Sequence, residues 1–204
     1  REEFRAEYIA DQYQALSDLI ESYELPRRTL TAINWNKREY DSIVETAAEE
    51  QADIIIKSTK QHDTVTSHTF MPIDWHLMRK SPIPVLLVKH NVWPSYAEIL
   101  AAVNTGDEDR NHNDLNEKLT STAEDFARLF SSNLHLVNAY PRIPLPLAKS
   151  SPSFTFNALN GAIQNHHKEA LYMFGLRHHI RGDNLYAQEG LPEQVIPSVA
   201  NNIH

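Results

Sequence analysis

Amide and hydroxyl side chains follow two apolar segments of the chain, and their types suit ligand binding. Asn104 and Thr105 come directly after an apolar run that ends at Val103, and a second run ends at Asn138 and Ala139. An amide both donates and accepts hydrogen bonds, so Asn104 could pair with the polar edge of a base. Val103, Asn104, Thr105, Asn138 and Ala139 are therefore the candidate ligand-binding residues.

A basic turn, Lys57-Ser58-Thr59-Lys60, follows another apolar run. The ammonium groups of Lys57 and Lys60 could hold a phosphate as point charges, which would make this turn part of a binding site. Charged side chains in loops are mostly solvated, so a plain surface loop is the alternative interpretation.

Two histidine pairs, His166-His167 and His178-His179, raise the question of a metal site. Adjacent residues point about 100° apart on a helix, so neither pair can chelate one ion by itself. We therefore predict no metal ligand and expect these histidines to be solvent-exposed.

The segment Asp74-Trp75-His76 contains an acid and a base of the kind used in catalysis. Neighbouring side chains on a helix do not face each other, so we interpret Trp75 instead as a packing anchor between domains. No serine lies in a G-x-S-x-G motif, and without cysteine there is no thiol nucleophile. The sequence therefore predicts no catalytic residue, and we expect a non-catalytic protein.

The elements that must position these residues alternate between helix and strand. Apolar spacing of three and four residues predicts helices, and short continuous apolar runs predict buried strands. Such an alternation is typical of a doubly wound α/β fold with a parallel sheet, in which ligands bind at the carboxyl ends of the strands. Helices are expected over 3–24, 40–50, 73–80, 112–131, 157–180 and from 191, and strands over 30–35, 53–56, 85–88, 99–103, 134–139 and 185–188.

Length and charge limit the class of protein. The 204 residues carry a net charge of -8 and include no cysteine, and neither half has the basic excess that binding to nucleic-acid phosphates requires. No run approaches the roughly 18 apolar residues of a membrane span. We therefore expect a cytoplasmic protein that neither binds nucleic acid nor inserts into a membrane.

An internal repeat predicts tandem domains. Asp41–Val44 and Glu193–Ile196 share the same polar-polar-apolar-apolar step after a short strand, and they are 193 − 41 = 152 residues apart. This separation predicts two units of about 150 residues, both incomplete in this chain. We place a first domain at 1–89, a linker at 90–96 and a second domain at 97–204. A single α/β domain is the alternative.

Several segments give the chain a family resemblance. Ala52–Ser58, followed by Arg79–Val88 with its Pro-x-Pro-Val strand, resembles the universal stress protein family. The blocks Thr69–Lys80, His112–Leu119, His135–Pro141 and Gly190–Pro197 resemble a tandem-domain type of that family. The resemblance implies two α/β domains of strand order 3-2-1-4-5 in a cytoplasmic protein of stress and DNA-damage resistance. It also implies a homodimer or an intramolecular pseudo-dimer.

The same resemblance bears on the ligand. Family members that bind ATP carry G-x2-G-x9-G-[S/T] after strand 4, but Lys57, Lys60 and Met71-Pro72 stand near those positions here. The resemblance therefore implies a degenerate first-domain loop that comprises Lys57, Ser58, Lys60, Met71 and Pro72. The corresponding second-domain loop would follow His204. Asn104 matches the family's acidic residue that faces adenine.

These observations favour a stress-response protein whose second domain binds a small ligand, with ATP or another adenine nucleotide as the candidate. A non-nucleotide interaction or dimerisation module and a weak ATPase are the alternatives. The short linker also leads us to expect two separate half-sheets, because it cannot return the chain to the centre of one hybrid sheet.

Overall fold

The computed structural model describes residues 2–24, 28–34, 38–59, 73–89, 97–107, 109–142 and 156–203. It divides the chain into two compact units, Arg1–Asn91 (unit 1) and Val92–His204 (unit 2). The predicted linker lies outside the described residues.

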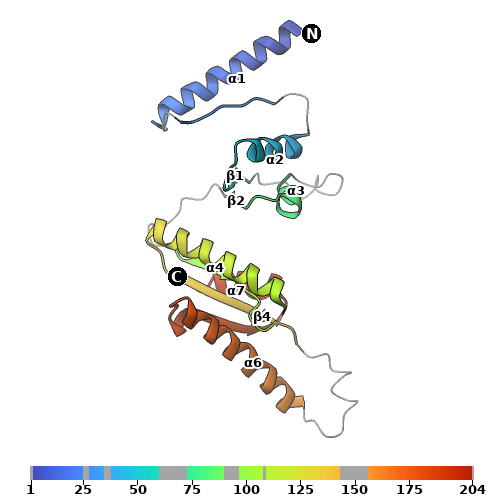
Figure 1. Ribbon diagram of the computed structural model, residues 1–204, viewed down its shortest axis with the longest axis vertical. Coiled ribbons are helices and arrows are strands. Elements are labelled where there is room, and N and C mark those ends of the chain that lie inside the picture. Colours follow the sequence, from blue (N-terminus) through green and yellow to red (C-terminus); the bar gives the residue numbers. More distant parts are fainter. Residues whose placement is uncertain are drawn as a thin grey trace. The chain divides into compact units, whose positions relative to one another are not determined.

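Unit 1 contains a two-stranded parallel sheet and helices (Figure 1). Ile55 pairs with Val85 and Ser58 with Val88, so the strands are in continuous register. Leu77 is fully buried, and Ile55 is also buried, which places the small core of this unit between its sheet and a helix. Its elements are α1 (Glu2–Ser22), α2 (Glu39–Glu49), β1 (Ile55–Ser58), α3 (Ile73–Lys80) and β2 (Val85–Val88).

Two expectations for unit 1 are wrong. Residues 30–34 form no strand, because an extended segment becomes a strand only by hydrogen bonding to a neighbour, and here β1 and β2 pair with each other. The second concerns the predicted strand 53–56, which begins two residues later, at Ile55, and is not buried on both faces. The side chain of Ile56 is 65% exposed.

Unit 2 contains a three-stranded parallel sheet of order β3-β4-β5. Ile99 pairs with Leu134, and Leu136 pairs with Leu185, so β4 lies between its neighbours and is the most deeply buried strand. The elements are β3 (Ile99–Ala102), α4 (Arg110–Phe130), β4 (Leu134–Tyr140), α6 (Phe156–Arg177), the 3-10 helix η1 (Gly182–Asn184), β5 (Leu185–Glu189) and α7 (Pro192–Ala200).

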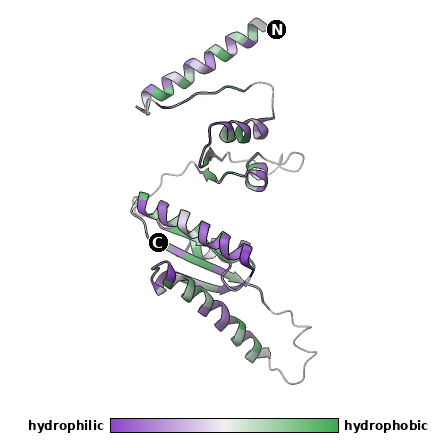
Figure 2. Ribbon diagram, viewed as in Figure 1, coloured by the Kyte–Doolittle hydropathy of each residue, from purple (hydrophilic) through white to green (hydrophobic). Residues whose placement is uncertain are grey.

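Helices cover both faces of this sheet, as predicted for a doubly wound fold. On one face α4 and α6 pack against the strands through a core that includes Leu136, Leu171 and Phe174. On the other face α7 packs through Val195 and Val199 against Val137. Figure 2 shows the strands of unit 2 as mostly hydrophobic, whereas its helices alternate between hydrophobic and hydrophilic residues.

The buried face of α4 includes polar residues. The apolar spacing correctly predicts the helix, yet Leu115 and Leu119 are exposed. The residues that follow each of them, Asn116 and Thr120, are buried together with Ala123. This offset brings an amide side chain to the end of β3.

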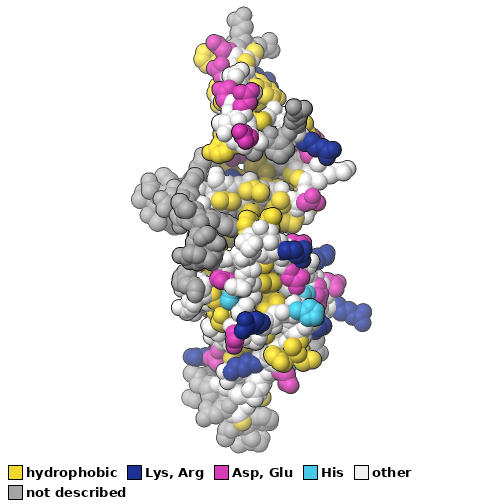
Figure 3. Space-filling model, turned by 90° about the vertical axis from the view of Figure 1, so that its left-hand side faces the viewer, with side chains coloured by type: hydrophobic (Ala, Val, Ile, Leu, Met, Phe, Trp, Pro, Cys, Tyr) yellow, Lys and Arg dark blue, Asp and Glu magenta, His cyan; other side chains and the backbone are white. Residues whose placement is uncertain are grey.

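The two sheets are separate, which confirms the expectation of two half-sheets for the described residues. Among those residues no helix is long and apolar enough to cross a membrane. On the face shown in Figure 3, acidic and basic side chains are interspersed with hydrophobic ones.

Candidate functional site

The sheet of unit 2 brings the predicted ligand-binding residues together. Ala102 pairs with Val137, and the backbone N–H of Val103 donates to the carbonyl of Val137 over 2.9 Å. The segment after β3, with Asn104 and Thr105, therefore lies beside the carboxyl end of β4, with Asn138 and Ala139. Their role in ligand binding remains a prediction.

Asn116 of α4 holds the backbone at the end of β3. Its Oδ1 accepts from the Asn104 N–H over 3.0 Å, and its Nδ2 donates to the Asn104 carbonyl over 2.9 Å. These two contacts satisfy the backbone N–H and carbonyl of Asn104. The side chain of Asn104 is exposed and is available to a ligand.

Asn138 is the most buried polar residue of this site, with 0% of its surface exposed. Its Nδ2 donates to the Thr105 hydroxyl over 2.9 Å, whereas its Oδ1 has no hydrogen-bond partner among the residues that the structure describes. Leaving a buried acceptor unpaired costs about 1–3 kcal/mol, and such a group in a native structure calls for an explanation. An unpaired acceptor at the end of a central strand is suited to a donor group on a ligand.

Two histidines of α6 also reach the site. The Nε2–H of His166 donates to the Gly106 carbonyl over 3.1 Å. Nδ1 of His167 lies 3.4 Å from Nδ2 of Asn138, which donates to it. The His167 ring also lies so close to Gly106 that a Cβ there would come within 2.1 Å of Nδ1, so any side chain at position 106 would require the ring to move.

Tyr140 completes the site as an aromatic platform. It is buried, and its ring stacks on the His167 ring with a centroid distance of 4.7 Å and an interplanar angle of 9°. Burial and the nearby Glu189 carboxylate raise the pKa of the Tyr140 hydroxyl. Burial, with a smaller effect of His166, lowers the pKa of His167, which favours the neutral ring that accepts from Asn138.

We call these residues the strand-end site: Val103, Asn104, Thr105, Gly106, Asn138, Ala139, Tyr140 and His167. The set contains hydrogen-bonding amides and a hydroxyl, an aromatic face and no lysine, arginine or carboxylate. Its chemistry therefore suits recognition of a polar, flat molecule. Among the described residues no group of three His, Asp or Glu side chains is placed to hold a metal ion.

Tyr140 was not predicted as a site residue, and His167 was predicted only as an exposed histidine. Sequence spacing identifies which residues share a face of one helix. It does not show that α6 packs beside the end of β4. The expectation that the paired histidines are solvent-exposed is wrong for His167 and also for His178. Both His178 ring nitrogens lie 2.8 Å from carboxylates of α4, those of Glu117 and Glu124.

In the first-domain loop, Lys57 is already engaged. Its ammonium lies 2.8 Å from Oδ1 of Asp74 and also donates to the Ser58 carbonyl over 3.0 Å. Because the Asp74 carboxylate already neutralises the Lys57 ammonium, this lysine is less able to bind a phosphate. The other candidates of this loop, Lys60, Met71 and Pro72, lie outside the described residues.

Asp74 and His76 do not form a dyad within the described part of unit 1. Asp74 pairs with Lys57, whereas the His76 ring lies 5.8 Å from the Tyr40 ring. The Trp75 side chain is 56% exposed. Its suggested role as an anchor between domains remains a prediction.

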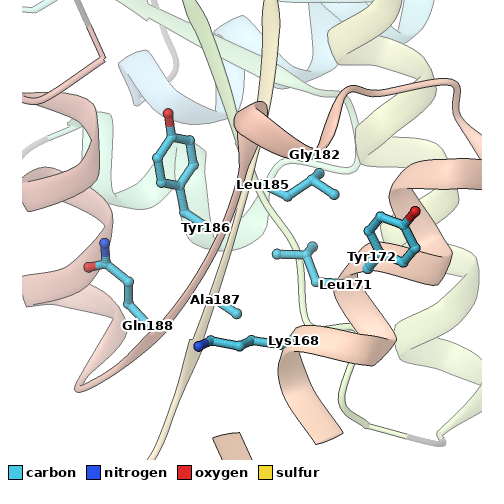
Figure 4. A pocket seen from close by; sticks show the side chains of 8 residues that line it. All are labelled: Lys168, Leu171, Tyr172, Gly182, Leu185, Tyr186, Ala187 and Gln188. Atoms are coloured by element: carbon cyan, nitrogen blue, oxygen red, sulfur yellow. The ribbon is translucent and has the colours of Figure 1, made fainter. Parts of the chain in front are cut away.

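A concave feature lies between α6 and the outer edge of β5 (Figure 4). It is an open groove of about 420 Å³. Leu185 and Ala187 point toward α6, whereas Tyr186 and Gln188 point to the other face of the strand, as the alternation of a β-strand requires. The lining residues are Lys168, Leu171, Tyr172, Gly182, Leu185, Tyr186, Ala187 and Gln188.

Known proteins resemble this chain over most of its length. The profile of the universal stress protein family matches residues 2–89. A universal stress protein E homolog of Haemophilus influenzae is 35% identical over 205 residues, which cover 100% of this chain and 66% of that protein. Universal stress protein E of Escherichia coli K12 is 35% identical over 170 residues, or 83% of this chain and 54% of that protein.

Solved structures of other proteins also resemble this chain. A putative universal stress protein of Pseudomonas aeruginosa UCBPP-PA14 matches with a TM-score of 0.71 at 25% identity, over 94% of this chain and 64% of the other. A functionally unknown protein of Pseudomonas aeruginosa PAO1 matches with a TM-score of 0.73 at 25% identity, over 94% and 63% of the two chains. The chain thus spans between about half and two thirds of the length of these proteins.

Proposed function

The chain belongs to the universal stress protein family, and on that basis we propose that it acts in the stress response by binding a small ligand at the strand-end site. The observation that carries this proposal is the Asn138 amide, which is fully buried at the end of the central strand with an unpaired Oδ1. A donor group on a bound ligand would satisfy that oxygen.

An adenine nucleotide is the ligand that the family resemblance favours. The base half of such a molecule fits the residues of the strand-end site, because amides pair with base edges and an aromatic ring stacks on a base. The site offers no lysine or arginine for the phosphates. We therefore expect recognition to depend mainly on the base.

The remaining parts of the proposal concern the location, the domain organisation and the biological role of the protein. We place the protein in the cytoplasm, as an expectation from the family, with tandem domains and a role in resistance to DNA damage. A weak ATPase is the weaker alternative, because the strand-end site contains no lysine or arginine to hold the phosphates.

A dimerisation module is the rival proposal. Within the described residues β2 pairs with β1 alone, so its other edge is available to a second strand. Light scattering at micromolar concentration tests this rival. A monomer at this concentration removes the main support for a dimerisation module, whereas a dimer supports that proposal.

Isothermal titration of the chain with ATP tests ligand binding. We expect saturable binding, weakened about two- to tenfold in Asn104→Ala, because one side-chain hydrogen bond contributes about 0.5–1.5 kcal/mol. The control is Asn202→Ala, an exposed asparagine in the turn after α7. No saturable binding at millimolar ATP would refute the nucleotide version of the proposal.

A further inference from the structure

We propose that the His167 imidazole is a built-in occupant of the strand-end site, which a ligand must displace in order to bind. The ligand class is a planar heteroaromatic molecule with an acceptor nitrogen beside an amino group. This inference rests on the proposed function, which places the ligand at the strand-end site. It adds an autoinhibitory contact at that place.

The His167 ring makes the contacts that such a ligand would make. It is a flat nitrogen heterocycle, it stacks nearly parallel on Tyr140, and its Nδ1 accepts from the Asn138 amide. Stacking on an aromatic face together with a hydrogen bond in the ring plane is the usual way in which proteins hold a nucleobase.

The imidazole satisfies only part of the site. Asn138 has two amide protons, one donated to Thr105 and one aimed at His167, but its Oδ1 stays unpaired. A ring with an acceptor nitrogen beside an amino group would use both Nδ2 and Oδ1, as asparagine does when it pairs with adenine. Such a ligand would therefore gain a hydrogen bond that the histidine cannot make.

The His167 contact is also weak enough to be exchanged. The amide-to-ring distance of 3.4 Å is long for a hydrogen bond, and the pKa of the ring is lowered, so no ion pair holds it. His166 anchors the same helix through its own bond to Gly106, which does not involve the His167 ring. The His167 side chain can thus leave while α6 stays attached.

Two variants remove the occupant in different ways. His167→Ala deletes the ring and leaves its space open, whereas Gly106→Ala expels the ring and fills that space itself, because the added Cβ would lie 2.1 Å from Nδ1. The matched control is His166→Ala, which loses the bond to Gly106 and leaves the occupant in place. A binding-competent state that is only partly populated weakens the apparent affinity by that fraction, so removing the occupant strengthens binding.

The first measurement uses free imidazole at about pH 8, where the ring is neutral. We expect imidazole to raise the melting temperature of His167→Ala while leaving those of the wild type and His166→Ala unchanged. An equal response in all three proteins would overturn the occupant proposal. If His167→Ala fails to fold, the same comparison is made with His167→Ser, which also removes the ring.

The second measurement titrates adenosine into the same proteins. We expect His167→Ala to bind it at least tenfold more tightly than the wild type and His166→Ala do, and Gly106→Ala to gain no affinity, because its added Cβ stands where the ring of the ligand would lie. Measurable adenosine binding that is unchanged or weaker in His167→Ala would contradict displacement by the ligand. If His167→Ala does not bind adenosine although imidazole stabilises it, the ring is an occupant of the site and the nucleotide function fails.

Discussion

Thr120 and Asn138 each bury a side-chain atom that has no hydrogen-bond partner, yet they differ in place. Asn138 lies at a strand end beside groups that can bind a ligand. Thr120 lies on the inner face of α4, and its burial there does not contribute to the strand-end site. We therefore interpret the unpaired Oδ1 of Asn138 as functional and the Thr120 hydroxyl as a cost to stability.

Thr120→Val tests this interpretation. The valine keeps the shape of threonine and removes the unpaired hydroxyl, so we expect the free energy of unfolding to rise by about 1 kcal/mol. Urea unfolding followed by circular dichroism measures it. The control is Thr122→Val on the same helix, where the exposed hydroxyl donates to the Lys118 carbonyl over 2.9 Å and the change should be small. A less stable Thr120→Val protein would show that the hydroxyl has a partner.

His167 predicts a dependence of stability on pH. Its pKa in the folded protein is lowered from the ordinary value of 6.5, mainly by burial, so the unfolded chain binds the proton more readily. The contribution of this ring is therefore complete above pH 6.5 and is lost as the pH falls from 6.5 through the folded pKa.

The measurement is the free energy of unfolding between pH 8 and pH 5 for the wild type, His167→Gln and His166→Gln. The loss below pH 6.5 should be reduced in His167→Gln and retained in His166→Gln. The titratable groups that contact the ring are the His166 imidazole of α6 and the Tyr140 ring of β4, which stacks on it. An identical pH profile for the wild type and His167→Gln would contradict the assignment.

At the scale of elements, Asn116 joins α4 to the end of β3. Replacing it by alanine removes both hydrogen bonds to the Asn104 backbone, which should destabilise the protein by about 1–3 kcal/mol and loosen the strand-end site. Urea unfolding measures the first effect. Asn113→Ala, an exposed position on the same helix, should change stability by less than about 0.5 kcal/mol. Equal effects of the two substitutions on the free energy of unfolding would show that the hydrogen bonds between Asn116 and the end of β3 do not stabilise the protein.

At the scale of the whole molecule, the two sheets predict separate responses to damage in their cores. Leu77 of unit 1 and Leu136 of unit 2 are both fully buried, so each Leu→Ala change should cost about 2–5 kcal/mol in its own unit. Hydrogen exchange with peptide resolution distinguishes the units. Leu136→Ala should speed exchange in β4 and leave β1 and β2 unchanged, and Leu77→Ala should do the reverse. Faster exchange in both sheets for either variant would show that the units unfold together.

Elements with strong local signals could be predicted from the amino-acid sequence. Helix 73–80 and strand Val85–Val88 lie where they were predicted, because Ser81-Pro82 stops the helix and a short apolar run follows it. The strands of unit 2 were likewise predicted within one residue at each end, since apolar runs bounded by polar residues mark buried strands. These elements, in their alternation, also determined the fold class and pointed to the strand ends.

The contacts between side chains depend on how the elements pack. The apolar spacing of Leu115 and Leu119 is typical of a helix, but these two side chains are exposed in α4, and the sheet buries Asn116 and Thr120 instead. The stacking of His167 on Tyr140 and its contact with Gly106 join three separate segments of the chain. The physical reason is that helix periodicity fixes which residues share a face, whereas the rotation of that face toward the sheet is set by the fit of both surfaces.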